Sequence, residues 1–275
     1  MIGCGTSTFT DPQDFSAPGV GLHVAFALAE AERFKAHLVW AILPSIRLLT
    51  IEEQAPRIAF LSLPPGATCV SFPLRSDPPS FWNGVRVRRG ALVLHAPGDR
   101  FHLRTAGVAR WGVMAMATGQ LASFGAALLG EDVALPARSS ILRLPHAIAG
   151  DFLRLHAQAF RLVEDWPDIF AHREVARALE QDLVRALVNG LKAAEWQPGS
   201  VNPRQAEMMV RFEGALLLAD GQPTSLGELC RVVGVSPQTL RKGSAAILGC
   251  TPTRYLRLRR RTRSPADPAN SAESA

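Results

Sequence analysis

Two short amphipathic helices separated by a glycine turn, within residues 224–260, constrain this chain of 275 residues more than any other feature. Apolar residues at i, i+3, i+4 and i+7 predict the first helix; they are Leu226, Leu229, Cys230 and Val233. Gly234 can adopt the positive φ that the turn requires. Ser236 and Pro237 then form a typical helix start, with a serine cap and a proline in the first turn. The pattern predicts a helix-turn-helix, whose second helix enters the major groove of DNA.

The second helix, about 236–248, has an inner apolar side and an outer polar side. Leu240, Ile247 and Leu248 face inward, whereas the outer side chains can bond base edges. Glutamine suits adenine, and arginine or lysine suits guanine. Ser236, at the helix start, is a candidate phosphate contact. We predict that the DNA-binding residues are Ser236, Gln238, Thr239, Arg241, Lys242, Arg254 and Arg257, and we expect Arg254, Arg257, Arg259 and Arg260 to contact phosphate or solvent.

The same stretch resembles the first helix-turn-helix of the AraC/XylS transcription regulators. The matching residues are Leu229, Gly234, Val235-Ser236, Thr239-Leu240-Arg241, Leu248-Gly249, Pro252, Tyr255 and Leu256-Arg257. The resemblance implies a sequence-specific transcriptional regulator with double-stranded DNA as its partner. It also implies that Gln238, Arg241 and Lys242 occupy the positions from which family members read bases.

Two features depart from that family. Gly243 and Ser244 stand where the family has a bulkier anchor, and we expect looser packing of the second helix, because glycine costs about 1 kcal/mol relative to alanine in a helix interior. The pattern after residue 260 predicts that the family's second helix-turn-helix is missing, and the Pro-, Ser- and Ala-rich residues 261–275 are expected to be disordered. With one reading head per chain, tight binding requires a homodimer. The alternative is a truncated regulator that no longer binds DNA and acts only through its sensor and dimerisation domain.

Positive charge is concentrated in the helix-turn-helix half. Residues 204–263 contain eleven Lys/Arg and four Asp/Glu, whereas residues 1–203 contain nineteen and eighteen. A polyanionic partner requires such a distribution, although a solvated basic face would also produce it.

Residues 34–116 have the pattern of β-strands separated by Pro- and Gly-rich turns, of which Asn83-Gly84 is a strong hairpin signal. The expected strands are 37–43, 46–51, 57–63, 67–74, 85–88, 91–95, 100–105 and 110–117, which indicate a sandwich or small barrel. Residues 81–102 resemble the jelly-roll (cupin-like) sensor that precedes many AraC-type DNA-binding domains. Its expected interior residues are Trp82, Val93, Phe101 and Trp111, and this apolar interior would suit a sensor that binds a small-molecule effector as well as one that binds only protein.

The remaining segments complete the domain organisation. Residues 1–35 are expected to be a partly ordered leader or a short helix anchored by Phe9 and Phe15. Residues 118–196 are helical in pattern, including a stripe from Val175 to Leu191 that would either pack on the core or pair two subunits. We therefore predict an α+β protein. Its domains are a β-rich sensor with appended helices at 1–198, a partial helix-turn-helix domain at 199–260 and a tail at 261–275.

A cupin-like metal enzyme is the alternative from a different functional class. His95 and His102 are candidates for ligands, but no H-x-H pair with a following glutamate occurs. The chain also lacks G-x-S-x-G, P-loop and G-x-G-x-x-G motifs and zinc-type cysteine spacing. We therefore expect no enzyme activity, no catalytic residue, no metal and no cofactor. Without a leader pattern or a membrane-length apolar run, the chain is expected to be cytoplasmic with no membrane segment.

Overall fold

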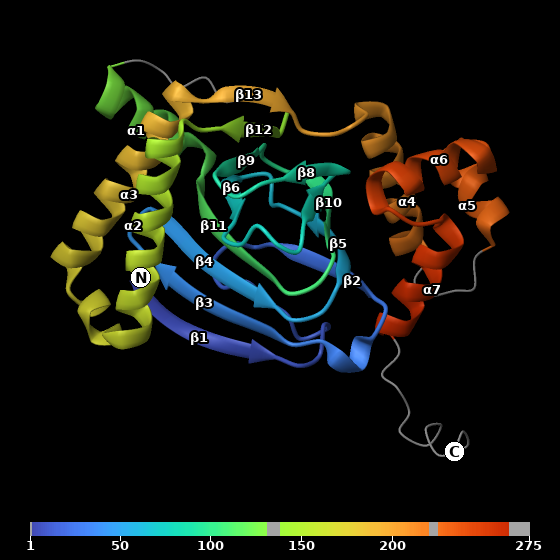
Figure 1. Ribbon diagram of the computed structural model, residues 1–275, viewed down its shortest axis with the longest axis horizontal. Coiled ribbons are helices and arrows are strands. Elements are labelled where there is room, and N and C mark those ends of the chain that lie inside the picture. Colours follow the sequence, from blue (N-terminus) through green and yellow to red (C-terminus); the bar gives the residue numbers. More distant parts are fainter. Residues whose placement is uncertain (1, 131–137, 220–224, 264–275) are drawn as a thin grey trace.

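The computed structural model describes residues 2–130, 138–219 and 225–263. Two antiparallel sheets face each other in this part of the chain (Figure 1). The larger sheet has the order β1 (Gly3–Phe9), β3 (Ala36–Ile42), β4 (Ile46–Glu53), β11 (Ala109–Ala117), β6 (Ala67–Pro73), β9 (Ala91–His95), β12 (Ser140–Arg143) and β13 (Glu195–Pro198). The smaller sheet has the order β2 (His23–Leu28), β5 (Arg57–Ser62), β10 (Arg100–Thr105), β7 (Ser80–Trp82) and β8 (Val85–Val87).

Helices cover the outer faces of both sheets, so the molecule has four layers (Figure 1). The larger sheet is covered by α1 (Thr118–Leu129), α2 (His146–Asp165) and α3 (Arg173–Ala193). The smaller sheet is covered by α4 (Pro203–Leu218), α5 (Leu226–Val233), α6 (Pro237–Leu248) and α7 (Pro252–Arg263). Two 3-10 turns complete the secondary structure, η1 (Ala31–Arg33) and η2 (Pro167–Ala171).

Alternating side chains of the strands divide the apolar residues among separate cores. Trp82, Val93, Phe101 and Trp111 are buried between the two sheets, where the sequence placed them. A second core lies between the larger sheet and α2 and α3. A third lies inside the α4–α7 bundle and includes Ala27 of β2 and Ile58 of β5. The C-terminal bundle and the smaller sheet therefore share one apolar core.

The apolar stripe of α3 packs inside its own chain. Leu183, Leu187, Val188 and Leu191 are buried in the core beneath α2. Of the two roles considered for this stripe, core packing is the one the structure shows. A dimer would have to use another surface.

The α+β fold class is confirmed, and each of the eight predicted strands corresponds to an observed strand. The expectation for residues 1–35 is wrong, because β1 pairs with β3 and β2 pairs with β5 over their whole lengths. Phe9 and Phe15 do act as anchors, but for strands: their ring centroids are 5.2 Å apart, and Phe15 lies 5.5 Å from Phe26 of β2. Gly, Ser and Thr obscure the alternation in β1, so backbone pairing holds this strand in place.

Strands β12 and β13 lie within 118–198, where helices and a domain break were expected. Residues 195–198, read as a helix end and a domain break, form β13 and pair with β12. Helix α7 includes residues 261–263 of the predicted tail, and residues 264–275 lie outside the described part of the chain. No helix in the described part is both long and apolar enough to cross a bilayer.

Candidate DNA-binding surface and its contact with the sensor

Side-chain caps define both helices of the helix-turn-helix. At the start of α5, Ser225 Oγ accepts a hydrogen bond from the Glu228 backbone N–H at 3.1 Å, and the Glu228 carboxylate accepts one from the Ser225 N–H at 2.8 Å. This reciprocal capping box satisfies two N–H groups that a helix start leaves free. Gly234 ends α5 with φ +74°. Ser236 then caps α6 by accepting from the Thr239 N–H at 3.1 Å.

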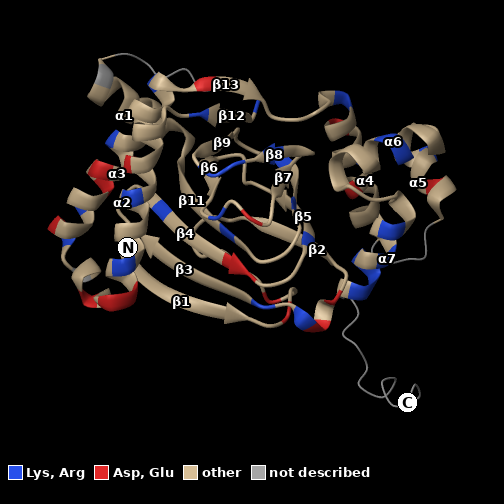
Figure 2. Cartoon of the chain, viewed as in Figure 1, with Lys and Arg blue, Asp and Glu red and all other residues tan. Residues whose placement is uncertain are grey.

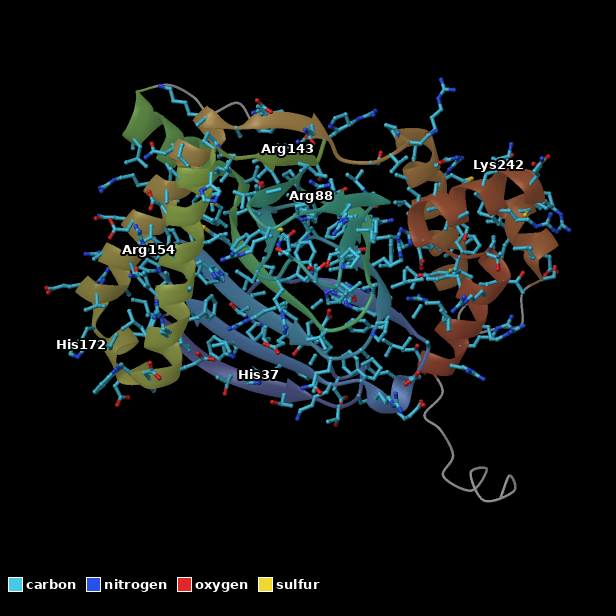
Figure 3. The ribbon with its side chains drawn as sticks, viewed as in Figure 1. His37, Arg88, Arg143, Arg154, His172 and Lys242 are labelled. Carbon is cyan, nitrogen blue, oxygen red and sulfur yellow. The ribbon has the colours of Figure 1, made fainter. Side chains whose placement is uncertain are left out.

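The predicted base-reading residues lie together on the exposed side of α6. Gln238, Arg241 and Lys242 are exposed, and their side chains form no hydrogen bond or ion pair within the described ranges. Lys242 projects from the outer edge of the bundle in Figure 3. Thr239 is also exposed, and its hydroxyl lies 2.9 Å from that of Ser236. Ser236 therefore serves as the helix cap, and an anion at this end of α6 would meet backbone N–H groups as well.

Helix α7, which follows α6 in the chain, also carries several basic residues (Figure 2). Arg254 and Arg257 are exposed, as the DNA-binding prediction requires, and Arg260 is exposed as well. The expectation for Arg259 is wrong. Only 7% of Arg259 is exposed, and its Nη2 lies 3.5 Å from Glu213 Oε2 of α4.

The expected loosening at Gly243 and Ser244 is not observed. A Cβ at position 243 would lie 2.0 Å from Met208 Cε, so Met208 of α4 occupies the space beside this glycine. Ser244 is fully buried, and its hydroxyl donates to the Cys250 carbonyl at 2.7 Å. The small residues permit close packing of α6 on α4 and anchor the end of α6 by a hydrogen bond.

A buried polar cluster joins the smaller sheet to the C-terminal bundle. Glu213 of α4 is fully buried and accepts a hydrogen bond from Tyr255 of α7. His102 of β10 lies 3.0 Å from Glu213 through its Nε2 atom. With Arg259, three polar groups therefore surround one carboxylate, and one of them belongs to the smaller sheet. Sequence reasoning missed this cluster. The sequence does contain one signal for it: Glu213 is an acidic residue on the apolar side of α4, four positions after Met209.

The surroundings of Glu213 favour its ionised form. Burial by itself raises the pKa of this carboxyl, but the hydrogen bond with His102, the charge of Arg259 and the hydrogen bond from Tyr255 together hold the pKa below its ordinary value. Burial, followed by the charge of Glu213, raises the pKa of Tyr255 well above its ordinary value. Tyr255 therefore remains a hydrogen-bond donor.

The Asn83-Gly84 turn between β7 and β8 is a second contact with the bundle. Asn83 Oδ1 accepts from the His102 N–H at 3.0 Å, so the turn and His102 are held together. Gly84 has φ +81°, and a Cβ there would lie 2.4 Å from the Ala246 carbonyl oxygen of α6. Only glycine allows this approach of the turn to the predicted reading helix. At the far end of the interface, Thr262 Oγ1 of α7 accepts from the Leu28 N–H of β2 at 2.9 Å.

The histidines considered as metal ligands have other surroundings. Among the described residues, no group of three or more His, Cys, Asp or Glu could hold a metal ion. His95 faces the space between the sheets, where its Nε2 lies 2.8 Å from Ser71 Oγ. Its Nδ1 is 3.6 Å from Asp99 Oδ2, which exceeds hydrogen-bond distance. The adjoining cavity of about 40 Å³ has room for water rather than for an organic substrate. These residues form a polar cluster in the core.

Comparison with known proteins gives similarities in structure only. No family model and no curated protein matches the sequence. The AraC-like transcriptional activator CuxR is 15% identical with a TM-score of 0.47, over 94% of this chain and 93% of that chain. ToxT from Vibrio cholerae is 10% identical with a TM-score of 0.30, over 78% of this chain and 98% of that chain. The Cnp3 cupin domain of Schizosaccharomyces pombe is 12% identical with a TM-score of 0.26, over 43% of this chain and 90% of that chain.

Proposed function

We propose that this chain is a sequence-specific DNA-binding transcriptional regulator whose α6 helix reads the major groove. The observation that carries the proposal is the set of unpaired polar side chains on the exposed side of α6, namely Gln238, Arg241 and Lys242. These residue types supply hydrogen bonds to adenine and guanine edges. Arg254 and Arg257 of α7 would contact phosphates beside the groove and fix the orientation of the protein.

We further propose that the β-rich part acts as a sensor that controls the reading helix. Its support is the shared interface, in which Glu213 meets His102 and the Gly84 turn meets Ala246. A change in the position of β7, β8 or β10 would move the surface on which α6 rests. A buried and closely packed interface favours a small number of discrete arrangements over continuous deformation.

Selection of duplexes from a random double-stranded pool tests DNA recognition. The purified chain should enrich a defined sequence, and its affinity should fall steeply as salt increases, because phosphate neutralisation releases counterions. Light scattering of the protein and of its complex would then establish whether two chains bind one site. A homodimer would present two reading heads to the same DNA, and so raise its affinity.

The competing function is a regulator fragment that acts without DNA. It is favoured by no contact in the structure, but the same experiment separates the two. A folded, dimeric protein that enriches no sequence and binds no duplex at low salt would support the fragment and contradict the DNA-binding proposal.

A further inference from the structure

The space between the sheets offers little room for an effector. The cavity there measures about 40 Å³ and is bordered by Phe101, Trp111 and Leu103. Sites for small organic ligands measure roughly 300–1,000 Å³. Two larger cavities bordered by described residues lie on the outer side of the larger sheet, beneath α2. One measures about 490 Å³, and a neighbour of about 470 Å³ shares Arg89 and Leu153 with it.

The larger of these outer cavities is lined by an excess of positive charge. Four arginines contribute to its walls, Arg75, Arg89, Arg110 and Arg161, against two acids, Glu52 and Glu164. Arg110 Nε lies 3.7 Å from Glu52 Oε2. Within the described ranges, the guanidinium groups of Arg75, Arg89 and Arg161 form no ion pair. Three guanidinium groups at one cavity are therefore free of ion pairs within the described ranges, although Glu164 lines the same cavity.

The inner wall of this cavity carries an unused polar atom. His156 of α2 lines it and is 1% exposed, and its Nε2 has no hydrogen-bond partner among the described residues. Burial, with a smaller contribution from the charge of Arg110, lowers the pKa of His156 to about 3, although a hydrogen bond to the Leu49 backbone partly opposes this shift. The ring is therefore neutral near pH 7. With one nitrogen bonded to Leu49, Nε2 is left as an acceptor for a hydroxyl or amino group.

We propose that the cavity between α2 and the larger sheet binds a small organic anion, whose phosphate or carboxylate groups pair with Arg75, Arg89 and Arg161. Arginine suits such groups, because its planar fork donates two parallel hydrogen bonds to them. Leu74, Leu153 and Phe160 provide apolar contact for the body of the molecule, and His156 accepts a hydrogen bond from it. Arg154, marked on α2 in Figure 3, lines the neighbouring cavity, but it already pairs with Asp151 at 2.9 Å.

Chain connectivity relates this site to the reading helix, and this step rests on the proposed function. Arg89 follows β8 by two residues, and Gly84 precedes β8 by one residue. The strand that ends near the arginines therefore begins at the turn that contacts Ala246 of α6. An anion held by Arg89 would reposition β8 and, through this turn, the surface beneath α6.

Anion binding is measured without DNA, so that its failure is separate from any failure of DNA recognition. Isothermal titration calorimetry and thermal denaturation would use pyrophosphate and citrate as probes, with sodium chloride at matched ionic strength. The two probes distinguish phosphate from carboxylate ligands. Compared with the wild type, the variant R75Q/R161Q should bind at least about tenfold more weakly, because hydrogen bonds to charged groups are lost. The single variant R89Q provides an independent test of the same site.

Arg143 is the matched control, because it is exposed on β12 (Figure 3) and lines neither of the two cavities. The variant R143Q should bind both probes as the wild type does. Binding of either probe that is lost in R75Q/R161Q and weakened in R89Q, but retained in R143Q, would support the site. Absence of binding by both probes, or binding of equal strength in the cavity variants and in R143Q, would overturn it.

Discussion

His102 of β10 and Glu213 of α4 lie 3.0 Å apart through Nε2 and Oε1, and both side chains are completely buried. His102 belongs to the smaller sheet and Glu213 to the C-terminal bundle, so the pair connects these two parts at a place that solvent does not reach. Arg259 and Tyr255 contact the same carboxylate. A buried charge is tolerated only where partners surround it, and removal of one member leaves the others uncompensated.

Replacement of Glu213 by glutamine should lower the free energy of unfolding by about 3 kcal/mol, since the side chain keeps its size but Arg259 loses its anion. Urea-induced unfolding followed by circular dichroism measures this change. The matched control is E207Q, at an exposed position on the same helix, which should differ from the wild type by less than about 0.5 kcal/mol. Equal stability of E213Q and E207Q would show that the cluster does not hold the interface.

The pH dependence of stability should report the burial of His156. Its pKa falls from 6.5 to about 3 on folding, so the unfolded chain binds more protons between these values. Stability therefore decreases as the pH falls below 6.5, and by pH 5 this histidine alone should remove about 2 kcal/mol relative to pH 7. Above pH 5, Glu213 remains ionised and does not contribute, because its pKa is already low.

Urea unfolding at pH 7 and pH 5 separates this effect from other titrations. The variant H156Q should lose the difference between the two pH values, whereas H172Q, at an exposed position marked in Figure 3, should keep it. If H156Q retained the full difference, the attribution to His156 would be incorrect.

Replacement of Gly84 by alanine should destabilise the contact between the sensor and α6. The new Cβ would meet the Ala246 carbonyl oxygen, and the residue would have to keep φ +81°. The expected cost is about 2 kcal/mol, from backbone strain and the displacement of α6. Thermal and urea unfolding measure it, and hydrogen exchange should show weaker protection of α6. The control is G66A, where an added Cβ has no neighbour within 4 Å. A G84A protein as stable as G66A would exclude a close contact at this turn.

Local signals predicted much of the architecture. Asn83-Gly84 indicated the hairpin between β7 and β8, and Gly234 and Ser236 marked the turn and cap of the helix-turn-helix. Such features depend on neighbouring residues alone, so a single sequence is enough to predict them. In contrast, β1 has little apolar alternation and exists because β3 supplies its hydrogen-bond partners.

Tertiary contacts account for what the sequence did not predict. Arg259 resembles the other arginines of α7, and only its position opposite Glu213 separates it from them. Gly243 weakens a helix considered by itself, but Met208, a residue of another helix, packs against it and leaves no room for a side chain there. The arginines of the proposed anion site, Arg75, Arg89 and Arg161, come from two loops and from α2, so no spacing in the sequence brings them together.

The most direct test of the account is the affinity of the chain for a duplex selected from a random pool. Fluorescence anisotropy at fixed salt would compare the wild type with R241A, K242A and the control R177A, an exposed position on α3. R241A and K242A should each weaken binding by about 1–3 kcal/mol and reduce the preference over a scrambled duplex, with R177A unchanged. Wild-type affinity and preference in both α6 variants would contradict the assignment of α6 as the reading helix.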